Sequence, residues 1–389
     1  MPPGRAQGKA GRPAGRFWPV RACSVSLLGT RHPESVTPLE LALDITPRAR
    51  FDVIDVKSRA AEVHRDALAP YGRCLYMSGH TTAGYLPQSL AARLTARAEA
   101  LHPYLEIFRA MFPEGAGYRH DQLDLRHELP PEQREVEPAN ADSHLAFIGS
   151  GLHACVTYDA RRPGPVYFVD LDGTNRGIPR RRTTTIVGYN DEVEVARTTL
   201  RVPVSTHPID AVNLKEPRLG LYEQLTDFIE RHDVPKGRVR LELASGEQFA
   251  SLTINEYETL LMRHDLAEVL TNPLRFATER ARHAWHDPRA VPVKALGYAK
   301  YDFVRALNQL VDALGLQASR IEQILARALA VPASRFLRMH RSVNLLVSDT
   351  RTSGRGTIVV GTYQAPILIQ WRPATADVRE VNVVLTRFL

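Results

Sequence analysis

The chain has 389 residues, 44% of them hydrophobic, which is enough for two domains of ordinary size with cores of their own. This composition excludes a chain that is disordered throughout. The formal charge of +7 does not by itself indicate nucleic-acid binding, because six of the basic residues lie in the first 33 positions, where there is no acidic residue. Without them the rest of the chain is nearly neutral, so we expect no specific nucleic-acid partner.

The cysteines and the apolar runs indicate a compartment. Cys23, Cys74 and Cys155 share no metal-binding spacing and cannot all pair, which predicts a reducing, cytoplasmic location. No run reaches the roughly 18 apolar residues that a membrane helix needs, so we expect no membrane partner. The arginine-rich leader, residues 1–37, is expected to be a basic flexible tail.

Strands and helices are predicted from residue 39 onward. The segment 39–56 alternates like two strands, a helical pattern follows over 58–72, and a strand at 73–79 leads into HTTAG. The segment 88–112 has helical spacing with a break expected at Pro103. A loop rich in Pro, Glu, Gly and His is expected over 113–142. The first half ends with a short helix and three strands, which is an α+β pattern.

The second half repeats this order. A polar stretch marks a domain boundary near residue 200, followed by a helix, a strand, a loop containing SLTINE and a helix at 256–270. A helix pair near 301–331 and three terminal strands complete the chain. We therefore predict a tandem duplication of one α+β domain, with copies at 38–200 and 201–389 and an insertion near 284–320.

The first half contains a histidine in a setting suited to chemistry. His80 follows a predicted strand in GHTTAG, where small residues allow a ligand to approach the backbone closely. Such a histidine can be a general base, a metal ligand or a donor to an oxyanion, or it can simply hold a backbone carbonyl. The later loop adds Tyr118, Arg119 and His120. NADSHL then places Asn140 and His144 at the start of a helix, where Asp142 can be its N-cap.

The second half contributes acidic and amide side chains. Asn255 and Glu256 stand together, and Asp265 follows nine residues later, about 250° around a helix, so the two acids need not share a face. His283 lies in RHAWHD. Tyr363 and Gln364 belong to GTYQ inside an apolar strand, where Gly and Gln usually mark a bulge or a close approach.

The order of these motifs resembles the YjbQ-like family. HTTA at a strand end, YRH in a loop, NADSHL opening a helix and a later LDG followed by an arginine-rich strand match that family over residues 38–200. The resemblance implies an α/β sandwich domain that typically forms trimers and has a weak secondary thiamine-phosphate synthase activity. We accordingly expect a homo-oligomer.

The family pattern is divided between the two halves. The family has Asn-Glu after HTTA and a GTWQ strand, but the first half has Gln88 and Ser89 in the one place and RPGPVYF in the other. The second half supplies SLTINE and GTYQ, whereas Glu247 stands near the position of the family histidine and Gln323 near that of the helix histidine. The second half thus resembles a second, diverged YjbQ-like copy.

This division predicts a composite site between the copies. His80, His120 and His144 would face the acidic residues Glu256 and Asp265, and these five are the expected catalytic residues. By the resemblance, the expected substrate-binding residues are Thr81, Thr82, Arg119, Asn140, Asn255, His283, Tyr363, Gln364 and Arg180.

The resemblance implies a transferase that condenses phosphorylated small molecules, or a diverged relative acting on another anionic metabolite. Departure of pyrophosphate would need positive charge from a divalent metal ion or from arginines, namely Arg119, Arg176 and Arg180 to Arg182. No cofactor is assigned; Mg²⁺ and Zn²⁺ remain options. One alternative is a metal-dependent enzyme that binds its metal through His80, His120 and His144. The other is a non-catalytic binding or assembly protein.

Overall fold

The structure is a computed structural model that describes residues 36–95, 101–272, 275–278, 339–350 and 354–389. Residues from Val36 onward form one compact unit. The basic leader up to residue 35, the insertion near 284–320, the helix pair near 301–331, His283 and Gln323 lie outside the described residues.

The first half of the unit runs from β1 to β9. Its elements are β1 (Leu39–Ile45), β2 (Asp52–Asp55), α1 (Val56–His64), η1 (Arg65–Leu68), β3 (Arg73–Ser78), β4 (Ala83–Tyr85), α2 (Gln88–Thr95), α3 (Leu101–Met111), η2 (Leu123–Leu125), α4 (Pro131–Arg134), α5 (Ala141–Ser150), β5 (Cys155–Asp159), β6 (Tyr167–Asp170), β7 (Thr174–Asn175), β8 (Ile178–Pro179) and β9 (Arg182–Tyr189). We refer to this half as copy 1.

The second half, copy 2, runs from β10 to β17. Its elements are β10 (Glu192–Pro203), β11 (Asp210–Asn213), η3 (Pro217–Leu219), α6 (Leu221–Glu230), β12 (Lys236–Leu243), β13 (Ala250–Glu256), η4 (Leu261–Asp265), α7 (Leu266–Thr271), β14 (Ser342–Ser348), β15 (Thr357–Val359), β16 (Gln364–Gln370) and β17 (Val378–Phe388).

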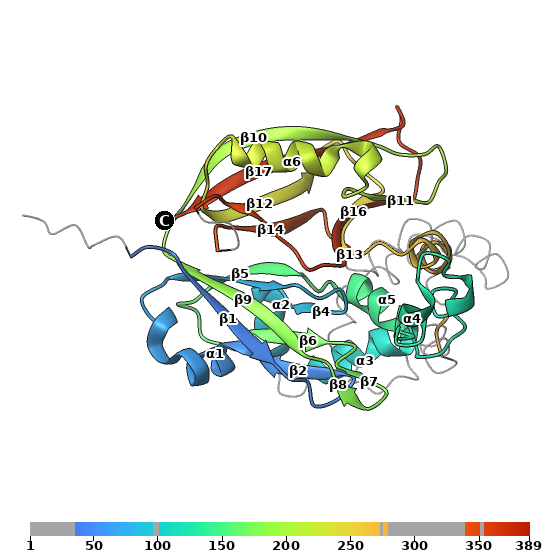
Figure 1. Cartoon of the computed structure of the whole chain (residues 1–389), viewed down its shortest axis with the longest axis horizontal. Coiled ribbons are helices and arrows are strands. Elements are labelled where there is room, and N and C mark those ends of the chain that lie inside the picture. Colours follow the sequence, from blue (N-terminus) through green and yellow to red (C-terminus); the bar gives the residue numbers. More distant parts are fainter. Residues whose placement is uncertain (1–35, 96–100, 273–274, 279–338, 351–353) are drawn as a thin grey trace, which may run out of the picture. The chain divides into compact units, whose positions relative to one another are not determined.

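The strand order of copy 1 repeats in copy 2 (Figure 1). Copy 1 has one sheet in the order β1-β9-β3-β5 and a second in the order β2-β6-β4. Copy 2 has β10-β17-β12-β14, extended by β15, and β11-β16-β13. In both copies the first strand therefore pairs with the last, and the third strand lies between the last and the fifth. Two independent domains would not share this order in both sheets, so the fold is a tandem duplication.

The register of the strands aligns the two copies residue by residue. Asp170 at the end of β6 pairs with Ala83, and Gln370 at the end of β16 pairs with Ala250. Counting forward from these alanines, Gln88 and Ser89 of copy 1 correspond to Asn255 and Glu256 of copy 2. At this point of the alignment copy 1 begins α2 at Gln88, whereas copy 2 continues β13 to Glu256, and only copy 2 has the Asn-Glu pair.

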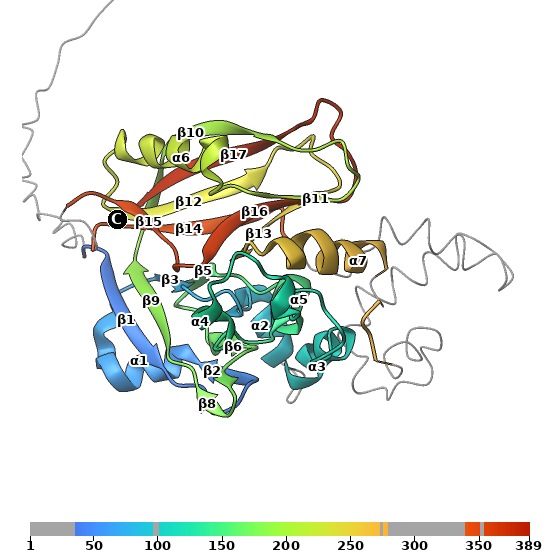
Figure 2. The ribbon, with the colours of Figure 1, turned by 45° about the vertical axis from the view of Figure 1, so that its right-hand side comes forward.

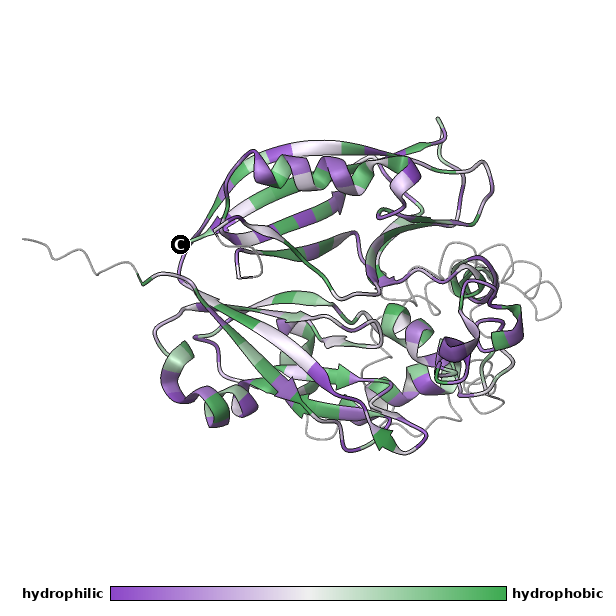
Figure 3. Ribbon diagram, in the orientation of Figure 1, coloured by the Kyte–Doolittle hydropathy of each residue, from purple (hydrophilic) through white to green (hydrophobic). Residues whose placement is uncertain are grey.

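Local sequence explains why these elements form. β12 alternates buried and half-exposed residues along KGRVRLEL, as a strand with one face on a core requires, and Figure 3 shows this alternation of hydropathy on the strands. α1 begins at Asp55, whose carboxylate accepts hydrogen bonds from the N–H groups of Lys57 and Ser58. α5 ends at Gly151, which has a φ of 70°.

Several expectations differ from the structure. FASLTINE, expected to be a loop, forms β13 over most of its length, because it pairs with the buried strand β16. Pro103 does not break a helix; it lies in the first turn of α3, where a missing N–H costs nothing. Asp142 is not the N-cap of α5, which is Asn140. The expected boundary at residue 200 falls inside β10, so the change of sheet occurs ten residues earlier, after β9.

The core is continuous through both copies. One cluster of buried residues includes Leu43 and Phe168 of copy 1 together with Leu241 and Ile367 of copy 2. Among the residues that the structure describes, no helix has the length and apolar character needed to cross a membrane.

Candidate functional site

A cleft of about 650 Å³ lies where the two copies meet. Copy 1 contributes the loop after β3, the loop before α5 and the arginines at the start of β9. Copy 2 contributes the end of β13. In Figures 1 and 2, as in the residue contacts, β13 lies beside α5. The predicted site residues that line the cleft are His80, Thr81, Asn140, Arg180, Glu256 and Tyr363.

The contact between His144 and Glu256 joins the copies behind this cleft. His144 on α5 is 1% exposed, and its Nε2 lies 4.0 Å from Oε2 of Glu256. Its Nδ1 lies 2.7 Å from Oδ1 of Asn255. Burial, followed by the neighbouring His120, lowers the pKa of His144 to about 3, so the imidazole is neutral.

Glu256 and Glu258 form a carboxyl pair on the copy 2 side of the cleft. The two side chains are hydrogen-bonded to each other, and burial raises the pKa of both, that of Glu258 to about 8. Arg126 lies 2.6 Å from Glu258 and so favours the charged form of that carboxyl. Because they are hydrogen-bonded to each other, the two carboxyl groups share one proton. A protonated carboxyl at a cleft is a group that can donate a proton near neutral pH.

His80 and Thr81 complete the cleft from copy 1. The N–H of Thr183 donates to Nε2 of His80 at 3.0 Å, which leaves the proton of the imidazole on Nδ1. Burial, followed by the charges of Arg182 and Arg180, lowers the pKa of His80 to about 4. The hydroxyl of Thr81 donates to Oε2 of Glu256 at 3.4 Å, a second bond between the copies.

His120 and Asp265 also join the copies, but they do not line the cleft. The carboxylate of Asp265 accepts the backbone N–H groups of Arg119 and His120, each at 2.9 Å. The ring of His120 is held by Asp121 at Nδ1 and by Arg126 at Nε2. Because arginine can only donate, Nε2 is an acceptor that is already occupied. Both residues thus hold other groups in place, which is not the catalytic role that was predicted for them.

Three consecutive arginines, two before β9 and one at its first residue, are each paired with an aspartate. Arg180 pairs with Asp172, and Arg182 makes two hydrogen bonds to the carboxylate of Asp170. Arg181 pairs with Asp44 at 2.5 Å and is 78% exposed. Arg180 and Arg181 therefore lie at the rim of the cleft with donors beyond those used in their pairs, whereas Arg182 is buried.

Four predicted binding residues have other surroundings. Thr82 is buried, and its carbonyl accepts the N–H of Leu171. The amide of Gln364 donates to the carbonyls of Ser78 and His80, so it holds the loop after β3. Asn255 is fully buried behind the cleft, and the side chain of Arg119 is exposed outside it. Arg176, expected to supply positive charge, instead donates to the carbonyl of Glu135.

The structure does not bring the three histidines together as metal ligands. Within the described part of the chain, no group of three or more His, Cys, Asp or Glu side chains is placed to hold a metal ion. Nε2 of His80 already accepts an N–H group, and Nε2 of His120 faces a guanidinium. The residues present do not fit a three-histidine zinc site.

Sequence reasoning missed the network around Arg126. This arginine is 1% exposed and lies within 3.3 Å of Glu128, Glu137 and Glu258. Arg126, Glu137 and Glu258 come from segments with no motif. The only signal available was Glu258 itself, two residues beyond Glu256 in the same acidic stretch.

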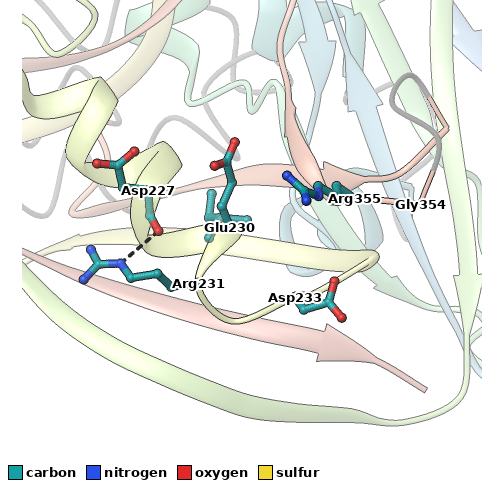
Figure 4. A pocket seen from close by; sticks show the side chains of 8 residues that line it. Asp227, Glu230, Arg231, Asp233, Gly354 and Arg355 are labelled. Carbon is teal, nitrogen blue, oxygen red and sulfur yellow. Dashed lines mark hydrogen bonds between the residues drawn. The ribbon is translucent and has the colours of Figure 1, made fainter.

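A second cavity, of about 940 Å³, lies on copy 2 at the end of α6 (Figure 4). Asp227, Glu230, Arg231, Asp233 and Arg355 line it, and Arg231 bonds to the carbonyl of Asp227. The raised carboxyl pKa values and the buried histidines are at the cleft and not here. The cleft is therefore the better candidate for chemistry.

Comparisons with known proteins give distant structural likenesses only. No family model matches the chain, and no curated protein matches it. A YbjQ-like protein of unknown function from Sulfolobus solfataricus aligns at 14% identity with a TM-score of 0.29, covering 51% of this chain and 99% of that one. An uncharacterized conserved protein of the yjbq family from Clostridium acetobutylicum aligns at 12% identity with a TM-score of 0.22, covering 50% and 100%.

A conserved hypothetical protein from Thermus thermophilus aligns at 18% identity with a TM-score of 0.23, covering 49% of this chain and 99% of that one. The duplication itself is established by the repeated strand order and does not depend on these likenesses. The YjbQ-like proteins among these each align with about half of this chain.

Proposed function

We propose that the chain is an enzyme that transfers protons on a small anionic metabolite bound in the cleft between its two copies. The observation that carries the proposal is the placement of the Glu256 carboxyl. It lines the cleft, shares a proton with Glu258 and lies 4.0 Å from Nε2 of a buried, neutral His144. A proton-holding carboxyl beside a neutral imidazole is the minimum set for general acid and base catalysis.

In this proposal Glu256 is the group that gives or takes the proton at the substrate. His144 accepts or returns it at Nε2, since Nδ1 is committed to Asn255. Thr81 orients the Glu256 carboxyl from the copy 1 side. His80 faces the cleft with a proton on Nδ1, where it can donate a hydrogen bond to an oxygen atom of the substrate.

The anionic part of the substrate is proposed to bind at Arg180 and Arg181. A guanidinium has five N–H donors, so each can bind a second anion while keeping its aspartate partner. These arginines would also stabilise an anionic leaving group. A transferase that releases pyrophosphate, as the YjbQ-like resemblance implies, is the reaction class that fits both features, and a diverged reaction on another phosphorylated or carboxylated metabolite uses the same groups.

The test compares wild type with Glu256→Gln on a panel of phosphorylated and carboxylated metabolites. Two readouts are used, pyrophosphate release from pairs of metabolites and deuterium exchange from solvent followed by NMR. The expected result is a rate at least about 100-fold lower in the variant, the usual contribution of one acid or base group.

The exposed Glu132→Gln is the matched control, because it changes the same chemical group outside the cleft. If Glu256→Gln keeps wild-type rates, or if no metabolite turns over while anions bind equally well to both proteins, the proposal is wrong. The second of these results would instead support a non-catalytic binding protein.

A further inference from the structure

We propose that the ligand of the cleft carries a protonated nitrogen in addition to its anionic group. The nitrogen would face Glu137, Glu256 and Glu258, and the anionic group would face Arg180 and Arg181. This inference rests on the proposed function only in taking this cleft as the ligand site, and it narrows the substrate to a class of bipolar molecules.

The wall of the cleft around Glu256, built from both copies, has more carboxyl groups than cations. Arg126 forms ion pairs with Glu128, Glu137 and Glu258, with nitrogen–oxygen distances of 2.9, 3.3 and 2.6 Å. Among the described residues no lysine or arginine forms an ion pair with Glu256, which shares a proton with Glu258. A single guanidinium thus stands against four carboxyl groups, of which Glu137, Glu256 and Glu258 line the cleft and Glu128 is exposed outside it. A cation brought into the cleft would be attracted to this wall.

Asn140 provides an independent sign of a missing partner on the same cleft. It lines the cleft, is 5% exposed, and its Nδ2 donates to Oδ2 of Asp172 at 2.8 Å. Since Asp172 also pairs with Arg180 and is an acceptor, the orientation of the amide is fixed with Oδ1 turned away from it. Oδ1 has no hydrogen-bond partner among the described residues. A buried acceptor without a partner calls for a donor such as an N–H group.

The opposite side of the cleft is basic, and no ion pair among the described residues joins the two sides. The rim arginines pair with aspartates outside the acidic wall, Arg180 with Asp172 and Arg181 with Asp44. Opposite charges that face one cleft without contacting each other favour a ligand that bridges them. The volume of about 650 Å³ suits a small metabolite.

Binding of the cationic group should release a proton. The Glu256 and Glu258 pair holds one proton before a ligand binds, and a cation can replace it. The charged and titratable groups that face the pair are Arg126 and Glu137, with Glu128, His120 and His144. None of these supplies a second cation at Glu256, so the proton leaves for the solvent.

The experiment measures affinities by calorimetry with two isosteric probes. Aminopropylphosphonate carries an ammonium group where butylphosphonate carries a methyl group. Wild type should bind the amino probe at least about tenfold more tightly, the effect of one charge-assisted contact. In Glu137→Gln the preference should fall below about threefold with little change for butylphosphonate, because Glu137 faces only the ammonium group. Glu132→Gln should keep the wild-type preference.

Calorimetry in two buffers of different ionisation enthalpy should also show proton release with the amino probe in wild type. Equal affinity for the two probes, tighter binding of butylphosphonate, or no binding of either would overturn the inference. The wild-type comparison decides the question even if Glu137→Gln does not fold. If wild type does not prefer the amino probe while Glu256→Gln is inactive, only the ligand class is refuted. Full activity of Glu256→Gln would instead refute the proposed function.

Discussion

At the scale of single residues, one backbone N–H group decides the state of the buried histidine. The N–H of Glu256 donates to the side chain of Asn255 at 2.7 Å, so the atom that receives it must be Oδ1. The same Oδ1 faces Nδ1 of His144, which must therefore carry the proton. Nε2 is left with its lone pair toward the Glu256 carboxyl. Copy 2 thus sets the tautomer of a histidine that copy 1 supplies.

Replacing Asn255 tests this chain of bonds. Asn255→Ala would leave the Nδ1–H of His144 and the N–H of Glu256 without their acceptor, and each unsatisfied buried donor costs about 1–3 kcal/mol. We expect the free energy of unfolding in urea to fall by roughly 2–4 kcal/mol. Asn175→Ala, which removes a longer bond at the surface, should cost well under half of that. Similar losses in the two variants would show that Asn255 does not bind both groups.

His80 also binds a backbone group, and copy 2 has a counterpart to this bond. Nε2 of His80 accepts the N–H of Thr183, and Oε1 of Glu247 accepts the N–H of Glu380. Thr183 and Glu380 each follow a buried arginine, Arg182 in β9 and Arg379 in β17. Glu247 pairs with its arginine at 2.7 Å, so the acid that stands in place of the histidine stabilises copy 2.

The lowered pKa of His80 predicts a dependence of stability on pH. The folded protein binds this proton with a pKa of about 4, below the value of about 6.5 in the unfolded chain, so unfolding takes up a proton between these values. Stability is therefore lost as the pH falls from about 6.5 toward 4.

The comparison is with His80→Gln, which keeps an acceptor for Thr183 but cannot be protonated. From pH 7 to pH 5 wild type should lose about 2 kcal/mol more stability than the variant, measured by urea unfolding at each pH. Asp142, whose pKa burial raises to about 6, acts in the opposite direction, but it is present in both proteins and cancels. Parallel pH profiles would contradict the buried, neutral state of His80.

At the scale of elements, the start of α2 shows what copy 1 has in place of the Asn-Glu pair. Gln88, at the position of Asn255, donates to the carbonyl of Asp159 and accepts its N–H at 2.9 and 3.0 Å. These two bonds attach α2 to β5 inside copy 1. The corresponding end of β13 instead contacts α5 of the other copy. This part of the chain therefore stabilises the fold of copy 1, whereas in copy 2 it contributes to the site between the copies.

The sequence predicted most strands and helices, because their apolar periods are regular, and it predicted the meeting of His144 with Glu256. It did not predict β13 as a strand, although Leu252 to Asn255 alternate apolar and polar residues, because the segment was matched to the motif loop of copy 1. It also did not predict Arg126 in the site. The partners of Arg126 lie up to 132 positions away, at Glu258, and no local pattern records such a contact.

The loop that carries His80 is held by a close approach of two glycines. Gly361 packs on Gly79, and a Cβ at residue 361 would overlap with the carbonyl oxygen of Gly79. Gln364 accepts the N–H of Gly361 and donates to the same loop. Gly361→Ala should therefore displace the loop and destabilise the protein by about 1–3 kcal/mol, measured by thermal unfolding.

The matched control is Gly246→Ala in the equivalent loop of copy 2, where nothing lies within 4 Å of an added Cβ. This variant should keep wild-type stability within about 0.5 kcal/mol. Anion binding in the cleft should weaken only in Gly361→Ala. Equal stability of the two variants would show that the contact between the glycines does not position the loop.

At the scale of the whole molecule, the two copies are joined by an apolar face of the β1-β9-β3-β5 sheet of copy 1. Leu75, Met77 and Val187 of copy 1 pack with Leu346 and Val359 of copy 2 in a separate buried cluster. In the same cluster the rings of Tyr189 and Phe388 stack, with their centroids 3.9 Å apart. The side chains of β12 that correspond to Leu75 and Met77 are Arg240 and Glu242, which form an ion pair with each other instead.

Because this face is apolar in copy 1 and carries an ion pair at the corresponding positions of copy 2, the two copies pack in one fixed arrangement. Leu346→Ala removes a fully buried side chain from the surface between copies and should cost about 2–5 kcal/mol. Because the core is continuous, we expect hydrogen exchange to speed up equally in β3 of copy 1 and β12 of copy 2, as in one cooperative unit. Val193→Ala, at a residue that is 45% exposed, should leave both unchanged. Faster exchange in β12 alone would mean that the copies unfold independently, and a site built from both would then not be held by the fold.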